Sequence, residues 1–176
     1  MNSKLEKDFK QLDAITQNLF ADLKKYPDNV LNKKPSLQAW SVVEILDHLM
    51  LAEEFSLKYL QKKVLDTSTA KEENLKVKWR WFLVKLVFAF NINFKAPQVV
   101  VPTIGAATLA EMETRWNAIR VQIIQLLQSL KDEDANKDLW KHAIAGKMNL
   151  YHMVEFLGMH LNRHKKQIER TLQLVK

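Results

Sequence analysis

Apolar residues recur every three or four positions over most of this 176-residue chain, and this spacing restricts the fold more than any other feature. Such spacing places apolar side chains along one face of an α-helix. It predicts four long amphipathic helices, at residues 3–26, 41–63, 108–131 and 149–174. Only three Gly and four Pro occur, which suits long helices and disfavours an all-β chain with many tight turns. We therefore expect an all-α fold.

Two of these predicted helices begin with a capping box. Ser41 is followed three residues later by Glu44, and Thr108 is followed in the same way by Glu111. In this motif the hydroxyl accepts a hydrogen bond from the backbone N–H three residues on, and the carboxylate accepts one from the backbone N–H of the first residue. Both motifs stand directly before apolar runs, so they predict where the two helices begin.

The segment between the second and third long helices changes character along its length. Residues 66–74 are polar and predict a loop, whereas residues 75–91 predict a helix that is apolar on nearly every side. Such a helix is either buried or held against a partner, so we expect it under a crossover or in a homodimer contact. Residues 91–107 contain two prolines and predict an extended strap. Residues 132–147 are polar and predict a further connection.

The composition favours one globular domain spanning residues 1–176. The apolar fraction is 47%, which is enough for a substantial core. The chain has no Cys, which excludes disulfides, thiolate metal sites and a cysteine nucleophile of the protein itself. Any metal ion must therefore be held by His, carboxylates or water.

Neither the N-terminus nor the charge points to a membrane or to nucleic acid. Residues 1–10 alternate charged and apolar side chains and lack the apolar stretch of a signal peptide. The most apolar run, residues 79–90, contains Arg80 and Lys85 and is too short to span a bilayer comfortably. The net charge is +7, but only five of the 27 basic residues are Arg and the lysines are spread along the chain. We therefore expect a soluble cytoplasmic protein with a solvated basic surface.

Three of the five histidines interrupt apolar stripes of predicted helices. His160 and His164 are four residues apart, which separates them by about 40° around a helix and about 6 Å along it. His48 lies on the inward stripe of the second long helix, between Ile45 and Ala52. Three neutral imidazoles could reach one ion in the bundle and leave a fourth position open, as in catalytic zinc sites. The spacing also fits hydrogen-bonded core histidines.

Two histidine motifs resemble those of the DinB-like superfamily. Residues 40–49 read Trp-Ser-Val-Val-Glu-Ile-Leu-Asp-His-Leu, which is similar to the family's second-helix motif, WS-x2-E-I-x2-HL. Residues 160–168 read His-Leu-Asn-Arg-His-Lys-Lys-Gln-Ile, which is similar to the terminal motif, H-x3-H-x2-QI. Both motifs keep the family's order and spacing.

Two further segments extend the resemblance over most of the chain. His142, with Gly146 four residues on, is similar to the family's HP-x2-G segment, although Ala143 stands where the family has Pro. Residues 94–97, together with Pro102, resemble the crossover strap of one branch of the superfamily. The departure at Ala143 allows this loop to follow a different path.

The resemblance implies an up-down-down-up four-helix bundle with a long crossover that contains an extra helix, residues 75–91. It also implies that His48, His160 and His164 hold one divalent metal ion, for which imidazole ligands favour zinc or nickel. Members of this superfamily include thiol-dependent S-transferases. The resemblance therefore implies a metal-dependent enzyme acting on a small-molecule substrate, either an S-transferase that uses a low-molecular-weight thiol or a related hydrolase.

Two other functions stay open at this point. A non-enzymatic metal-binding or stress-associated bundle with a protein partner would account for the apolar segment 75–91, whereas nucleic-acid binding has only the net charge in its favour. The motifs identify no general base and no catalytic residue. His142 is predicted either as a plain loop residue or as part of the mouth of the site. His152 projects about 80° away from His160. It is predicted at the surface or at its boundary, with orientation of a ligand or substrate from the rim of the site as the alternative.

Overall fold

The computed structural model describes residues 3–65, 67–92 and 95–175. The described chain is mostly helical and has one small two-stranded antiparallel sheet. Two short 3-10 segments lie at Gln98–Val100 and Asp132–Asn136. The helices are α1 (Ser3–Leu23), α2 (Asp28–Leu31), α3 (Val42–Val64), α4 (Leu75–Ala89), α5 (Leu109–Ser129) and α6 (Leu150–Val175), and the strands are β1 (Trp140–His142) and β2 (Gly146–Met148).

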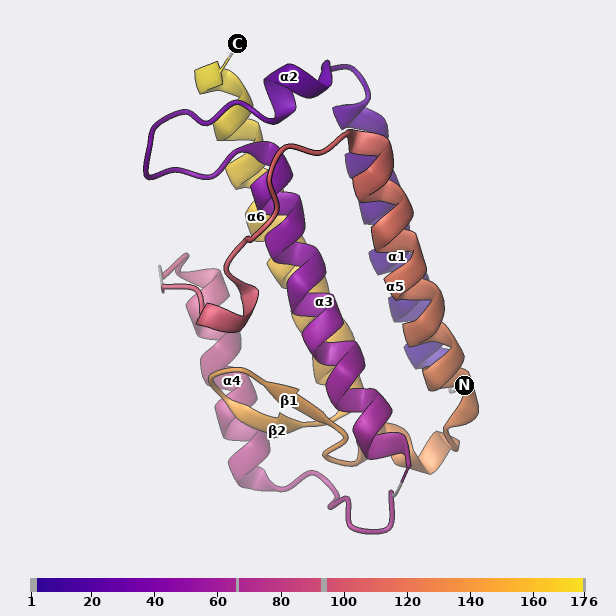
Figure 1. The fold of residues 1–176 in the computed structure, drawn as a ribbon. Coiled ribbons are helices and arrows are strands. Elements are labelled where there is room, and N and C mark those ends of the chain that lie inside the picture. The colour runs from indigo at the N-terminus through magenta and orange to yellow at the C-terminus, as the bar shows by residue number, and fades with distance from the viewer. Residues whose placement is uncertain (1–2, 66, 93–94, 176) are drawn as a thin grey trace.

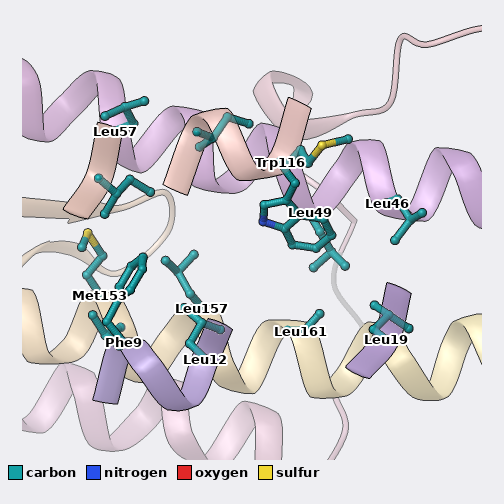
Figure 2. Packing of buried hydrophobic residues seen from close by; sticks show 14 of the residues in the cluster. Phe9, Leu12, Leu19, Leu46, Leu49, Leu57, Trp116, Met153, Leu157 and Leu161 are labelled. Atoms are coloured by element: carbon teal, nitrogen blue, oxygen red, sulfur yellow. The ribbon is translucent and has the colours of Figure 1, made fainter. Parts of the chain in front are cut away.

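Four long helices, α1, α3, α5 and α6, lie side by side and share one core (Figure 1). Helix α3 packs against both α5 and α6, and α1 packs against both α6 and α5. All four contribute apolar side chains to the interior, as the periodicity predicts. Figure 2 shows ten labelled members of this core: Phe9, Leu12, Leu19, Leu46, Leu49, Leu57, Trp116, Met153, Leu157 and Leu161.

Both predicted capping boxes are confirmed. The Glu44 backbone N–H donates to Ser41 Oγ at 3.2 Å, and the Ser41 backbone N–H donates to Glu44 Oε2 at 2.9 Å. The same pair of bonds joins Thr108 and Glu111, at 3.2 and 2.7 Å. Each cap satisfies backbone donors that the helix leaves unpaired and contributes about 1 kcal/mol. The caps fix where α3 and α5 begin.

A buried ion cluster joins three of the long helices. Arg120 of α5 is almost fully buried and donates to Glu53 of α3 and to Asp13 of α1, at 2.8 and 3.0 Å. Burial alone would lower the pKa of Arg120, but the two carboxylates raise it, so the guanidinium stays charged. The cluster fixes the position of α5 relative to α3 and α1, because a buried charge without its partner is costly.

Helix α4 is only half covered within the chain, so burial under the crossover accounts for its inner face alone, and the homodimer contact predicted as the alternative stays a prediction. Its inner face packs on α6, where Trp81 Nε1 donates to Glu155 at 3.0 Å and is itself buried. Its outer face is exposed: Trp79 and Phe82 stack on each other with 5.5 Å between ring centroids. Residues 95–107 form a strap that crosses α3 and contains the 3-10 segment Gln98–Val100 (Figure 1). The 94–97 motif lies partly outside the described residues, because Phe94 is not among them.

The connection predicted at residues 132–147 contains regular structure that its polarity conceals. A 3-10 segment is followed by a hairpin in which Trp140 pairs with Met148, and both side chains are buried. Gly146 has φ of +83°, a backbone conformation that suits glycine. Strands of three residues are too short for alternation to reveal. In the described part of the chain, no helix is long and apolar enough to cross a membrane.

Candidate metal centre

Three histidines from two helices converge at one point. His48 comes from α3, and His160 and His164 come from successive turns of α6, which packs against α3. Each offers one ring nitrogen, and these three atoms lie within 4.8 Å of one another. His48 Nε2 and His160 Nε2 are 3.1 Å apart. His48 and His164 are buried, and His160 keeps part of its surface accessible beside a cavity.

Two neighbours orient the imidazoles. The carbonyl oxygen of Val100, in the strap, accepts a hydrogen bond from His48 Nδ1 at 2.6 Å. The side-chain oxygen of Gln167, one turn further along α6, accepts one from His164 Nδ1 at 2.8 Å. With the proton on Nδ1, each of these two rings carries its lone pair on Nε2, and the Nε2 atom of His48 faces that of His160 at 3.1 Å. Such outer partners commonly set the tautomer of metal-binding histidines.

The residues fit a divalent ion. Two imidazole nitrogens on a tetrahedral zinc ion stand about 3.3 Å apart, given bond lengths of about 2.0–2.1 Å. The distance of 3.1 Å between the Nε2 atoms of His48 and His160 is close to this value. Two inward lone pairs at such a distance repel each other unless a proton or a cation lies between them. The cluster is therefore wide enough and electron-rich enough to hold one ion.

The electrostatics keep these rings neutral, which is the form that binds metal. Burial lowers the pKa of His48, although the Val100 carbonyl opposes the shift. Burial, reinforced by the neighbouring histidines, lowers the pKa of His160 well below its ordinary value. Burial, together with the repulsion that would act between charged His48 and charged His164, lowers the pKa of His164 to about 4. The site therefore holds neutral imidazoles near neutral pH.

Asp47, next to His48, has a supporting role that the sequence analysis missed. Its side chain is buried, accepts from Arg115 at 2.6 Å and accepts from the Thr103 backbone N–H at 3.1 Å. The strap is thus attached to α3 twice, through Asp47 to Thr103 and through His48 to Val100. An aspartate on the buried stripe of a helix, beside a candidate ligand, was the signal available in the sequence.

His142 lines the cavity beside the triad. Of its two predicted places, a plain loop position or the mouth of the site, the structure favours the second. Its Nδ1 accepts from the backbone N–H groups of Ile144 and Ala145, at 3.2 and 3.0 Å. Burial lowers its pKa to about 4, so the ring is neutral at pH 7 and carries its proton on Nε2. The ring lies edge-on to Phe156, with 4.6 Å between centroids.

His152 is buried, which corrects its predicted place at the surface or boundary. Its ring stacks on Trp81 of α4 at 4.6 Å, and its Nε2 lies 3.3 Å from Glu73 Oε1. Burial and the nearby charge of Lys85 lower its pKa to about 4. His152 therefore belongs to the contact between α4 and α6 and not to the triad.

A cavity of about 1130 Å³ opens beside the three histidines. Its wall comes from α3, α4, α6, the strap and the loop of the hairpin, so segments from most of the chain meet there. Most of the wall is apolar, and Phe156 stacks on His160 with 5.2 Å between ring centroids. A pocket of this size beside convergent polar groups is a typical small-molecule site.

This helical fold with its histidine cluster defines a class of protein: the chain belongs to the DinB superfamily, whose family model matches residues 11–168. A comparison with curated proteins finds the uncharacterized protein YuaE of Bacillus subtilis (strain 168). It is 27% identical over 154 residues, which covers 88% of this chain and 90% of that protein. The match extends over nearly the full length of both proteins.

Proposed function

We propose that this protein is a metal-dependent enzyme in which His48, His160 and His164 hold one divalent ion, zinc or nickel. The observation that supports this proposal most directly is the convergence of three neutral imidazole nitrogens within 4.8 Å, at the edge of a large cavity. Three protein nitrogens leave a position for a substrate group, as in catalytic zinc sites. The reaction is transfer of a low-molecular-weight thiol to an electrophile, or a related hydrolysis.

A divalent ion bound there would supply Lewis acidity, which lowers the pKa of a thiol or of water. The chain contributes the remaining functions of the site. Val100 and Gln167 hold two rings in the ligating tautomer, and Phe156 covers His160 and limits competing water. Among the described residues no Asp or Glu lines the cavity. The protonated Nε2 of His142 is the group that we assign to donate a hydrogen bond to the substrate.

The metal part of the proposal is tested by elemental analysis of the purified protein. We expect about one divalent ion per chain in wild type and almost none in His160→Ala. His152→Gln is the matched control, because it removes a buried histidine of the same helix that lies outside the triad, and it should keep its metal. Equal, near-zero metal in all three proteins would contradict the proposal.

The chemical part is tested by the rate of conjugation of a small thiol to a reactive electrophile. Metal-loaded wild type should accelerate the reaction above free metal, and His48→Ala should abolish the gain. Bacillithiol, mycothiol and glutathione with several electrophiles cover the range of donors. No acceleration with any pair would remove the transferase reading and leave hydrolysis to be tested.

The proposal includes the domain organisation. We take residues 1–176 as one domain with the up-down-down-up order of helices that the family resemblance implies. The single core shared by α1, α3, α5 and α6 supports this organisation.

A non-enzymatic metal-binding bundle with a protein partner is the second candidate function. The exposed aromatic face of α4 favours it, because large apolar side chains in water commonly mark contact surfaces.

A further inference from the structure

The cavity beside the triad has an unbalanced charge. Five cationic side chains line it and, among the described residues, no carboxylate does; these cations are Arg80, Lys95, Lys141, Arg163 and Arg170. The chain as a whole carries 27 basic and 20 acidic residues, so a wall of this size without one carboxylate departs from the average surface. Concentrated charge of one sign in a cleft attracts ligands of the opposite sign.

The two arginines that do not line the cavity, Arg115 and Arg120, are paired with carboxylates. Arg115 pairs with Asp47 and Glu54, at 2.6 and 2.9 Å, and the buried Arg120 pairs with Glu53 and Asp13. Around the cavity, Arg80 donates to a backbone carbonyl, that of Lys147, at 3.1 Å.

No ion pair to a carboxylate joins Arg80, Lys95, Lys141 or Arg170 anywhere in the part of the chain that the structure describes. Arg115 and Arg120, which join helices of the bundle, are thus paired with carboxylates, whereas Arg80 and Arg170 at the cavity have no such ion pair among the described residues.

An apolar wall runs from one of these cations to the triad. The guanidinium of Arg163 stands 5.9 Å from the centre of the Phe88 ring of α4. Phe88 lies edge-on to Phe156 at 5.9 Å, and Phe156 stacks on His160 at 5.2 Å. A ligand with an acidic group at Arg163 and an apolar body on these rings would therefore extend to the histidines.

We propose that the cavity binds an amphipathic organic anion, with a carboxylate, sulfonate or phosphate at the cationic rim and an apolar body against Phe88 and Phe156. The inference rests on the proposed function in one respect, since it takes this anion as the substrate class of the same site. Its physical basis is independent of the metal, because the positive charges belong to the chain itself. Apolar pockets with a few placed charges select ligands in this way.

The first test is calorimetric titration of the full chain with probes that share an alkyl tail and differ in head group. Dodecanoate should bind at one site per chain, and dodecyltrimethylammonium should bind much more weakly. Acetate, which has the charge without the tail, should not bind detectably. Raising the salt concentration should weaken dodecanoate binding, because exposed charges are screened. Equal binding of the anionic and cationic amphiphiles would overturn the inference.

The second test locates the site. Arg163→Gln and Arg170→Gln should each weaken dodecanoate binding about fivefold, which is the upper range for one exposed charge contact. Lys62→Gln is the matched control, since it removes the same charge from an exposed position of α3 that does not line the cavity. Circular dichroism of each variant checks that its helices are intact. If Lys62→Gln weakened dodecanoate binding as much as the arginine variants do, only the net charge of the protein would matter. That result would contradict binding of the anion in this cavity.

Both titrations are run on the protein as purified and after dialysis against a chelator, together with a measurement of metal content. We expect the preference for the anion in both states. Bound metal without any preference for the anion would refute this inference and leave the metal proposal standing. A preference for the anion in a protein that never binds metal would support this inference and refute the metal proposal.

Discussion

At the scale of single residues, the site depends on groups that do not themselves reach its centre. Val100 and Gln167 accept the Nδ1 protons of His48 and His164, which leaves Nε2 of each ring free to ligate. Val100 acts through its backbone, so side-chain substitution cannot remove that bond. Gln167 acts through its side chain and therefore gives a direct test of orientation.

We predict that Gln167→Ala lowers the affinity for the divalent ion by about 10- to 100-fold, the usual effect of removing a residue that orients a metal ligand. The ring of His164 then loses its preferred tautomer and orientation. The measurement is a competition titration of zinc against a chromophoric chelator. Gln173→Ala, on an exposed position of the same helix, is the control and should bind as wild type does. Unchanged affinity in Gln167→Ala would show that Gln167 does not orient the ligand.

At the scale of elements, two arginines connect α5 to α3, the helix that carries His48. Arg115 of α5 holds Asp47, which holds the strap, and Arg120 of α5 holds Glu53. These two arginines differ in environment, since Arg120 is almost fully buried and the Arg115 side chain is 36% exposed. Their carboxylate partners on α3 should therefore differ in what they contribute to stability.

We predict that Glu53→Ala lowers the free energy of unfolding by about 3 kcal/mol, because it leaves Arg120 buried with only Asp13 as a counter-charge. Glu54→Ala is the neighbouring control; it should cost about 1 kcal/mol or less, since Arg115 is partly solvated and keeps Asp47. Urea denaturation followed by circular dichroism measures both. Equal losses in the two variants would contradict the role assigned to the buried cluster.

The outer face of α4 gives a second test at this scale. We expect it to form a homodimer contact, because Trp79, Phe82 and Phe90 are exposed on one side of the helix. Size-exclusion chromatography with light scattering should show a dimer for wild type and a monomer for the double variant Trp79→Glu, Phe82→Glu. Val121→Glu changes an exposed apolar residue of α5 and should stay dimeric. A wild-type monomer at every concentration would rule out the contact.

At the scale of the whole molecule, the sequence predicted the long helices and the histidines better than the connections. The intervals of three and four residues placed α3 and α5 within two residues of their observed ends, because amphipathic helices of that length leave a strong pattern. The motifs around His48 and His160 predicted that these residues meet, and they do. Helix α2 and the hairpin at Trp140 are too short to leave such a pattern.

Properties that depend on two distant segments were not predictable from periodicity. The cavity combines α4, α6, the strap and the hairpin loop, so its positive wall emerges only when these segments are brought together. The burial of His152 depends on Trp81 of α4, which is 71 positions away in the sequence. The exposure of Trp79 depends on which face of α4 packs on α6. Because α4 carries apolar residues on every face, the sequence pattern does not indicate which face is buried.

The central claim is that the three histidines hold one divalent ion, and X-ray absorption spectroscopy of the metal-loaded protein tests it most directly. We predict a first shell of low coordination number with nitrogen neighbours at about 2.0–2.1 Å for zinc. The outer-shell scattering should be typical of three imidazole rings, and it should lose one ring in His160→Ala. A shell of oxygen neighbours without imidazole scattering, unchanged in that variant, would contradict the account.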